Sequence, residues 1–484
     1  MSLTKSEFDL LNYFRETRNI TQRDMADKFS KSLGKVNKHV KDLKSKELIN
    51  NTDTVYDITE RGMDALKPYK VNNAIIMAAG MSSRFAPLSY ERPKGLLNVK
   101  GEILIEREIR QLQEAGITDI TIVVGYMKEK FFYLEEKFGA KIVVNEDYYQ
   151  YNNTSTLIRV LDKLSNTYIC SSDNYFVDNV FDPYVYKGYY SAVYAAGETD
   201  EYCLKCDSHG RITDVTVGGS NAWYMLGHVY FDKEFSDKFT AILRTEYEKP
   251  ETKNGLWEDL YAKHLKELAL YIRKYDADKV REFDSLEELR DFDEEYINNA
   301  DSTILKNICK ILKCEMKDIV NVKAIKAGLT NTSFQFEIGS QGYVYRHPGN
   351  GTSKYINRMS EAFSMKVAAE LGLDDTFIYM DENEGWKISK FIKNARQLDY
   401  NNRAEVDMAL KMMRMLHDKK IVSKYDFGIW QKTEEFIKRL DEIGKSDFED
   451  FKELYNTMSE LKAMRICLEN LRLYQERMKQ TVQI

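Results

Sequence analysis

The sequence predicts an α/β fold with a doubly wound, mostly parallel sheet at its centre. Buried strands are predicted by short apolar runs at residues 74–77, 117–126 and 141–145. An amphipathic helical segment lies between the first two, at residues 103–115. Strands that alternate with helices form parallel sheets, because each helix returns the chain to the edge where it started. The expected domains are residues 1–70, 71–300 and 301–484.

The composition is that of a globular protein. Hydrophobic residues make up 43% of the chain and charged residues 31%, as in soluble domains. No apolar stretch reaches the roughly 20 residues that span a bilayer, and the N-terminus lacks an apolar signal core, so we expect a cytoplasmic protein. The net charge of −6 argues against general affinity of the whole molecule for nucleic acid. Cys203 and Cys206 form one C-x-x-C without a second pair, which predicts two thiols rather than a zinc or redox site.

Residues 1–70 are predicted to form three short helices and a hairpin. Phe8, Leu11 and Phe14 recur at helical spacing on the first helix. The segment 28–46 carries seven lysines and one histidine against a single acid, Asp42. A basic helix after a turn resembles the recognition helix of winged helix-turn-helix regulators. The resemblance implies duplex DNA as a partner, bound through residues 28–46, and a protein-docking role for the same domain stays open.

The most informative segment directly follows the first predicted strand. It reads Ala78-Ala79-Gly80-Met81-Ser82-Ser83-Arg84-Phe85, and Pro93-Lys94 comes shortly after it. The small side chains and the glycine let the backbone approach a ligand closely. The hydroxyls of Ser82 and Ser83, with the backbone N–H groups, can hold a phosphate. Arg84 and Lys94 add the positive charge that a polyphosphate needs, so the segment predicts a nucleoside triphosphate site.

Asp173 is the second candidate for chemistry. It follows a short predicted strand, residues 168–170, and ligands of open α/β sheets bind at the carboxyl ends of such strands. A carboxylate there can hold Mg²⁺ against a triphosphate, so we expect Mg²⁺ as the cofactor. A second carboxylate is expected for an in-line displacement at phosphorus. The sequence offers Glu258 as the first choice and Asp259 as the second.

The segment 78–94 resembles the signature A-A-G-x-x-S-R-F…P-K of sugar-phosphate nucleotidyltransferases, and residues 73–298 resemble the bacterial CTP:phosphocholine cytidylyltransferases of the Lic type. The resemblance implies transfer of CMP from CTP to phosphocholine, which yields CDP-choline and pyrophosphate. It implies that the nucleoside is surrounded by Ala78, Ala79, Gly80, Gly125 and Asn153. It implies phosphate contacts from Ser82, Ser83, Arg84 and Lys94, and a catalytic set of Arg84, Lys94 and Asp173. It implies Mg²⁺ ligands at Asp173 and Glu258 and an aromatic wall for choline at Tyr202 and Trp257.

Several alternatives remain open at this level. The family more often has an acid-rich stretch where this chain has Ser171-Ser172-Asp173-Asn174, which leaves the second metal ligand undecided. Residue spacing does not distinguish phosphocholine from a sugar phosphate or a polyol phosphate as the acceptor. A different function is that of a DNA-binding regulator whose nucleotidyltransferase domain senses a ligand without turnover. The presence of Arg84, Lys94 and Asp173 together favours turnover, because a sensor does not need a metal carboxylate.

The C-terminal segment predicts an incomplete α+β domain. Residues 328–349 and 386–392 resemble the N-terminal lobe of choline kinases and aminoglycoside-phosphotransferase-like enzymes. Those enzymes need an H-x-D-x-x-x-x-N segment for the base and for Mg²⁺, and none occurs after residue 392. Asp426-Phe427-Gly428 spells a kinase-like tripeptide, which we interpret as a chance loop. We therefore expect no kinase activity. Two interpretations remain: the chain is a fragment of a longer bifunctional protein, or its kinase-like lobe is vestigial.

Overall fold

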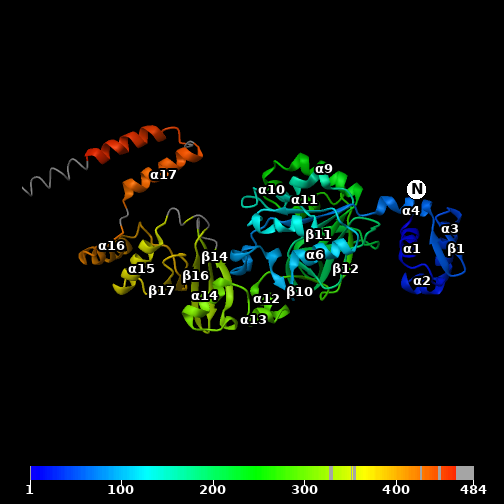
Figure 1. Cartoon of the computed structure of the whole chain (residues 1–484), viewed down its shortest axis with the longest axis horizontal. Helices are drawn as coiled ribbons and strands as arrows, with labels where there is room; N and C mark the ends of the chain where they lie inside the picture. Colours follow the sequence, from blue (N-terminus) through cyan, green and yellow to red (C-terminus); the bar gives the residue numbers. More distant parts are fainter. Residues whose placement is uncertain are drawn as a thin grey trace, which may run out of the picture. The chain divides into compact units, whose positions relative to one another are not determined.

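The computed structural model describes residues 2–325, 331–349, 352, 356–425, 428–444 and 448–464. Two compact units are present (Figure 1), one of residues 1–355 with 376–394 and one of residues 356–375 with 395–484. The glycine turn predicted at 328–330 and the tripeptide at Asp426 fall outside the described residues. Within the described part of the chain, no helix combines the length and the apolar character needed to cross a membrane.

The N-terminal domain is a winged helix, as predicted. Its elements are α1 Lys5–Glu16, α2 Gln22–Lys28, α3 Leu33–Ser45, β1 Ile49–Thr52, β2 Val55–Ile58, α4 Glu60–Leu66 and η1 Lys67–Tyr69. Thr4, Thr21 and Ser32 cap the first three helices by accepting backbone N–H bonds, which satisfies donors that a helix start leaves unpaired. The antiparallel pair β1–β2 forms the wing.

A seven-stranded sheet forms the centre of the next domain, in the order β12-β10-β11-β8-β3-β6-β7. Its strands are β3 Asn73–Ala78, β6 Ile120–Val124, β7 Lys141–Val144, β8 Thr167–Ser171, β10 Tyr189–Cys206, β11 Ile212–Phe231 and β12 Tyr271–Tyr275. Only β11 runs antiparallel to its neighbours in this sheet. The predicted doubly wound, mostly parallel sheet is therefore confirmed.

Helices cover both faces of this sheet, and α9, α10 and α11 lie together in Figure 1. One apolar core joins α6 and α7 to one face, and a second core joins η5, α9 and α11 to the other. The helices are α5 Leu88–Glu91, α6 Leu104–Glu114, α7 Tyr133–Phe138, α8 Thr154–Leu157, α9 Lys233–Glu246, α10 Pro250–Lys253 and α11 Trp257–Lys263. The 3₁₀ turns are η2 Ser83–Phe85, η3 Lys94–Leu96, η4 Lys128–Phe131 and η5 Ile158–Lys163.

Two short strand pairs lie outside the main sheet. They are β4 Asn98–Val99 with β5 Glu102–Ile103, and β9 Asn174–Phe176 with β13 Val280–Glu282. The second pair matters for the site, because β9 begins immediately after Asp173 and its antiparallel register sets Glu282 opposite Asn174.

Residues 286–394 add helices and a five-stranded antiparallel sheet in the order β14-β15-β16-β18-β17. The helices are α12 Leu286–Phe292, α13 Glu295–Asn298 and α14 Thr303–Leu312, with η6 Met316–Asp318. The strands are β14 Val320–Ile325, β15 Thr332–Ile338, β16 Gln341–His347, β17 Phe377–Met380 and β18 Lys387–Lys390. The second unit contains α15 Arg358–Glu370, α16 Arg403–Asp418 and α17 Ile429–Ile443. The kinase-like origin of this region stays a prediction.

Candidate active site

A cavity of about 430 Å³ lies where the parallel strands β3 and β8 end. The loop after β3, the Pro93–Lys94 turn and the turn after β8 converge there, as the order of strands in the sheet requires. The predicted residues that line it are Ala78, Ala79, Gly80, Ser82, Ser83, Arg84, Lys94, Asn153 and Asp173. The predicted residues Gly125, Tyr202, Trp257 and Glu258 do not line it.

The loop after β3 keeps the cavity open. A Cβ atom at Gly80 would meet no protein atom within 4 Å, so the glycine leaves room for a ligand rather than relieving a clash with the protein. Ser82 adopts a left-handed backbone with φ of 45°, which turns the chain into η2. Phe85 is buried and anchors the end of the loop, whereas the Arg84 side chain is 77% exposed and its Nη2 lies 3.9 Å from Asp284 Oδ1.

Lys94 is the buried cation of the site, with 5% of its side chain exposed. Its Nζ lies 2.9 Å from Asp173 Oδ2 and 3.7 Å from Glu282 Oε1. Burial disfavours the charged ammonium, but the charges of Asp173 and Glu282 outweigh it and raise the pKa of Lys94. Gly95 permits this geometry, because a Cβ atom there would lie 2.7 Å from Ser172 Oγ. Lys94 is therefore held charged against the turn that carries Asp173.

Glu282 is the carboxylate that the sequence analysis missed. It ends β13, and the pairing of β13 with β9 brings it beside the turn at Asp173. Although 36% of its side chain is exposed, desolvation and the charge of Asp173 raise the pKa of Glu282, and Lys94 lowers it. Asp173 and Glu282 thus place two carboxylates beside the loop after β3, and carboxylate oxygens are ligands that divalent cations prefer. The sequence analysis did not predict the short strand at residues 280–282, because sequence periodicity does not reveal it.

Glu258 and Asp259 have hydrogen-bond partners in the protein other than Asp173. Glu258 is buried, accepts hydrogen bonds from Asn153 Nδ2 at 3.0 Å and Tyr190 Oη at 3.2 Å, and has a pKa raised to about 7 by desolvation. Asp259 accepts from the backbone N–H of Leu256 at 3.0 Å at the start of α11. Both carboxylates therefore contact the segment around the start of helix α11, and Glu282 is the carboxylate that lies near Lys94 and Asp173.

The packing corrects the expectation for Trp257 and gives Asn153 and Tyr202 partners within the protein. Asn153 lines the cavity, but its amide is used to bind α11, because Oδ1 accepts from the Trp257 N–H at 2.8 Å while Nδ2 donates to Glu258. Trp257 is 1% exposed and stacks on Tyr190, with ring centroids 5.6 Å apart, so its ring belongs to the core and not to a ligand wall. The hydroxyl of Tyr202 donates to Asp259 at 2.7 Å, outside the cavity lining.

Gly125 does not line the cavity but contacts residues that do. A Cβ atom there would lie 2.7 Å from the Tyr148 side chain and 2.8 Å from the Ala79 carbonyl oxygen. The next residue, Tyr126, donates its N–H to that same carbonyl at 3.1 Å. The glycine thus allows β6 to end against the loop after β3, and Ala79 and Tyr148 line the cavity in its place.

Two regions of this chain are similar to known proteins. Residues 74–207 match the MobA-like NTP transferase domain, and residues 3–50 match a winged helix-turn-helix DNA-binding family. A choline-phosphate cytidylyltransferase from Streptococcus pneumoniae is 33% identical over 221 residues, which cover 46% of this chain and 96% of that protein. A 2-aminoethylphosphonate cytidylyltransferase from Lancefieldella rimae is 35% identical over 229 residues, which cover 46% and 93%.

A solved structure of CTP:phosphocholine cytidylyltransferase from Streptococcus pneumoniae is 33% identical and covers 46% of this chain and 97% of that one, with a TM-score of 0.45. The sequence relatives match across nearly their whole length. The chain is therefore an enzyme of the nucleotidyltransferase class and belongs to the cytidylyltransferase family that includes the choline-phosphate cytidylyltransferases.

Proposed function

We propose that this chain transfers CMP from CTP to phosphocholine, forming CDP-choline and releasing pyrophosphate. The observation that carries the proposal is the buried ammonium of Lys94, which lies 2.9 Å from Asp173 beneath an open loop of small residues and serines. Attack of the acceptor phosphate on the α-phosphorus of CTP needs no covalent enzyme intermediate. Such transfers depend on positioning and on stabilising negative charge.

The residues of the cavity divide this work. The backbone N–H groups of residues 80–83 and the hydroxyls of Ser82 and Ser83 bind the triphosphate, and exposed Arg84 reaches its outer phosphates. Lys94 stabilises charge that develops on the departing pyrophosphate. Asp173 and Glu282 would hold Mg²⁺, since hard carboxylate oxygens together with nucleotide phosphates are the usual ligands of this ion. Bound Mg²⁺ would neutralise phosphate charge and align the oxygens for in-line attack.

One observation favours 2-aminoethylphosphonate as a second candidate acceptor. The aromatic wall expected for a quaternary ammonium lacks Trp257, whose ring is buried in the core. A primary ammonium, in contrast, donates hydrogen bonds and needs a carboxylate or carbonyl more than ring faces. The relative named for that acceptor is also 35% identical, against 33% for the one named for choline phosphate.

The test is pyrophosphate release by the purified full chain with CTP and Mg²⁺. The acceptors are phosphocholine, 2-aminoethylphosphonate, phosphoethanolamine, a sugar phosphate and a polyol phosphate. We expect the highest kcat/KM with phosphocholine, loss of turnover in Asp173→Asn, and unchanged turnover in the control Asp119→Asn, whose carboxylate pairs with exposed Lys141. Preference for another acceptor would replace the substrate. CTP binding without turnover on any acceptor would favour a ligand sensor.

We also propose duplex DNA as a partner of the winged helix. Val36, Val40 and Leu43 are buried in α3, so Lys35, Lys38 and Lys41 lie on its exposed side. Phosphate contacts from such lysines release counterions, so affinity should fall steeply with salt. Fluorescence anisotropy with duplex DNA should show this dependence and its loss when these three lysines are changed to glutamine. Salt-independent binding, or none at low salt, would leave protein docking as the role of this domain.

A further inference from the structure

A second cavity, of about 770 Å³, lies between helix α1 and the edge strand β12 of the main sheet. Helix α1 contributes Lys5 and Asp9, β12 contributes Tyr271 and Arg273, and the segment before β10 contributes Lys187. Its volume falls in the range of about 300–1,000 Å³ that holds small ligands. The candidate active site lies at strands β3 and β8, so the two cavities share no lining residue.

The cavity exists because the winged helix docks on the catalytic domain. The Tyr186 hydroxyl donates to the Leu3 carbonyl at 3.1 Å, and its ring lies 5.4 Å from that of Phe8. The guanidinium of Arg15 lies 4.9 Å from the ring centroid of Tyr184. A ligand in this cavity would therefore touch both domains, and its binding energy would depend on how they are docked.

Cationic donors exceed carboxylates in the cavity. Asp9 is paired with Lys5 at 2.7 Å, and Asp182 is paired with Arg273 at 2.7 Å. Lys187 has no carboxylate within 4.0 Å among the residues that the structure describes, and its Nζ donates to the Tyr271 hydroxyl at 3.0 Å.

Arg273 also has hydrogen-bond donors available for a ligand. It donates from Nη1 to Asp182 and to Tyr189. No hydrogen bond within the described ranges uses its Nε or Nη2 atoms. Lys187 and Arg273 therefore keep unused donors next to a tyrosine-lined space, and guanidinium and ammonium groups with spare donors bind phosphate.

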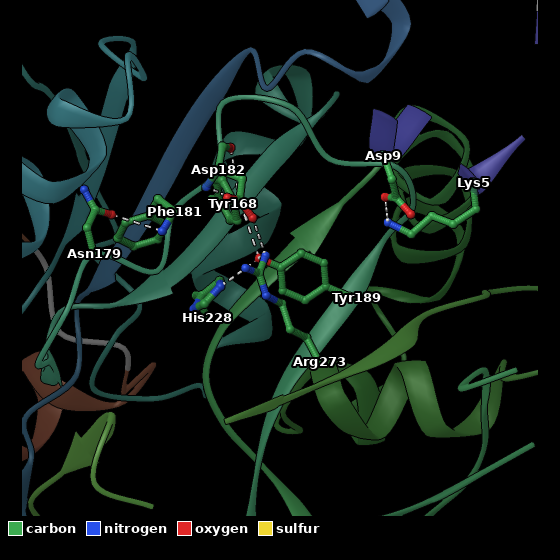
Figure 2. Close-up of polar contacts among 9 residues, drawn as sticks. All are labelled: Lys5, Asp9, Tyr168, Asn179, Phe181, Asp182, Tyr189, His228 and Arg273. Atoms are coloured by element: carbon green, nitrogen blue, oxygen red, sulfur yellow. Dashed lines mark hydrogen bonds and ion pairs between the residues drawn. The ribbon is translucent and has the colours of Figure 1, made fainter. Parts of the chain in front are cut away.

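Figure 2 shows the hydrogen bonds that join Arg273, Tyr189 and His228. Its Nη1 donates to Tyr189 Oη at 2.9 Å, and that hydroxyl bonds His228 Nε2 at 2.9 Å. His228 is fully buried, and its ring centroid lies 5.4 Å from that of Phe176 on β9. Strand β9 starts directly after Asp173. A continuous set of contacts thus joins Arg273 to the strand that carries the carboxylate turn of the active site.

We propose that this second cavity binds a phosphate ester, whose phosphate is held by Lys187 and Arg273 and whose occupancy stabilises the docking of the winged helix on the catalytic domain. A ligand that contacts both domains favours the docked arrangement. Ligand binding and docking therefore strengthen each other, and any activity that depends on docking changes when the ligand binds. This inference does not depend on which acceptor the active site uses.

The test is calorimetric titration of the full chain with CMP, with inorganic phosphate as a parallel probe. Wild type should bind CMP at two sites. Lys187→Gln should weaken one of them about ten-fold or more, because a charge-assisted hydrogen bond is lost, whereas Arg84→Gln should weaken only the other. The control Lys141→Gln removes an exposed lysine on β7, at the opposite edge of the same sheet, and should bind as wild type does. A single CMP site in wild type, or an unchanged isotherm in Lys187→Gln, would overturn the proposal.

Hydrogen exchange of the α1 amides measures the docking. In the Arg84→Gln background, CMP should slow their exchange, and the added change Lys187→Gln should abolish that effect. If CMP leaves the exchange rates of the α1 amides unchanged, the proposed link to docking is wrong. If inorganic phosphate binds as tightly as CMP, the proposal of a phosphate ester is wrong and the cavity is a site for the free anion.

Discussion

Replacing Glu258 with glutamine should stabilise the protein, but only at neutral and alkaline pH. Desolvation raises the pKa of Glu258 from its ordinary value of 4.5 to about 7. One pKa unit corresponds to about 1.4 kcal/mol, so ionised Glu258 lowers the free energy of unfolding by about 3 kcal/mol at pH 8 relative to pH 4. Glutamine keeps the contacts, since its carbonyl accepts from Asn153 and its amide donates to the Tyr190 hydroxyl, which can accept.

The sign follows from proton binding. Between pH 4.5 and pH 7 the folded chain holds the proton on Glu258 and the unfolded chain does not, so wild type loses stability as pH rises through that window. Glu258→Gln has no such loss. The two proteins should therefore be similarly stable at pH 4.5 and differ by about 3 kcal/mol at pH 8.

Urea unfolding of the full chain at these two pH values, followed by tryptophan fluorescence, measures the difference, because Trp257 is buried beside Glu258. The control is Glu246→Gln, since hydrogen bonds from Lys263 and Lys249 lower the pKa of Glu246 to about 2. It should lose stability at neutral pH, with the opposite sign. A pH-independent gain, or a loss, in Glu258→Gln would refute the reasoning, as would loss of pyrophosphate release, which would return Glu258 to the metal site.

The remaining predictions concern residues around the first cavity. Glu282→Gln should lower kcat for pyrophosphate release by about 100-fold or more and raise the Mg²⁺ concentration needed for half-maximal rate, and an unchanged Mg²⁺ dependence would contradict its role. Lys94→Met should lower the free energy of unfolding by about 2 kcal/mol at pH 8, less than for a fully buried pair because both carboxylates are partly hydrated. Gly125→Ala should cost about 1–3 kcal/mol in urea unfolding and weaken CTP binding, because its Cβ would press on Tyr148 and displace the loop after β3. If this variant has the same free energy of unfolding as wild type, the loop after β3 moves without loss of stability and the reasoning is wrong.

The predictions that held were those made by local pattern. The first strand, its small-residue loop and the lysine after Pro93 could be assigned because apolar periodicity and residue chemistry fix a strand, a turn and a charge independently of distant contacts. The long hairpin of β10 and β11 was not predicted. Its strands run 18 and 20 residues with several register shifts, which obscure the regular alternation of buried and exposed side chains.

The sequence by itself determined the α/β architecture, the winged helix and the loop of small residues after the first strand, and it singled out Lys94 and Asp173. The tertiary structure alone decided that Glu282 lies near Asp173 and that the ring of Trp257 belongs to the core. The physical reason is distance along the chain. The partner of Asp173 is chosen by the pairing of β13 with β9, residues 280–282 against 174–176. A carboxylate near a tryptophan has the same local pattern whether it binds a metal or fixes a helix, and only packing distinguishes the two.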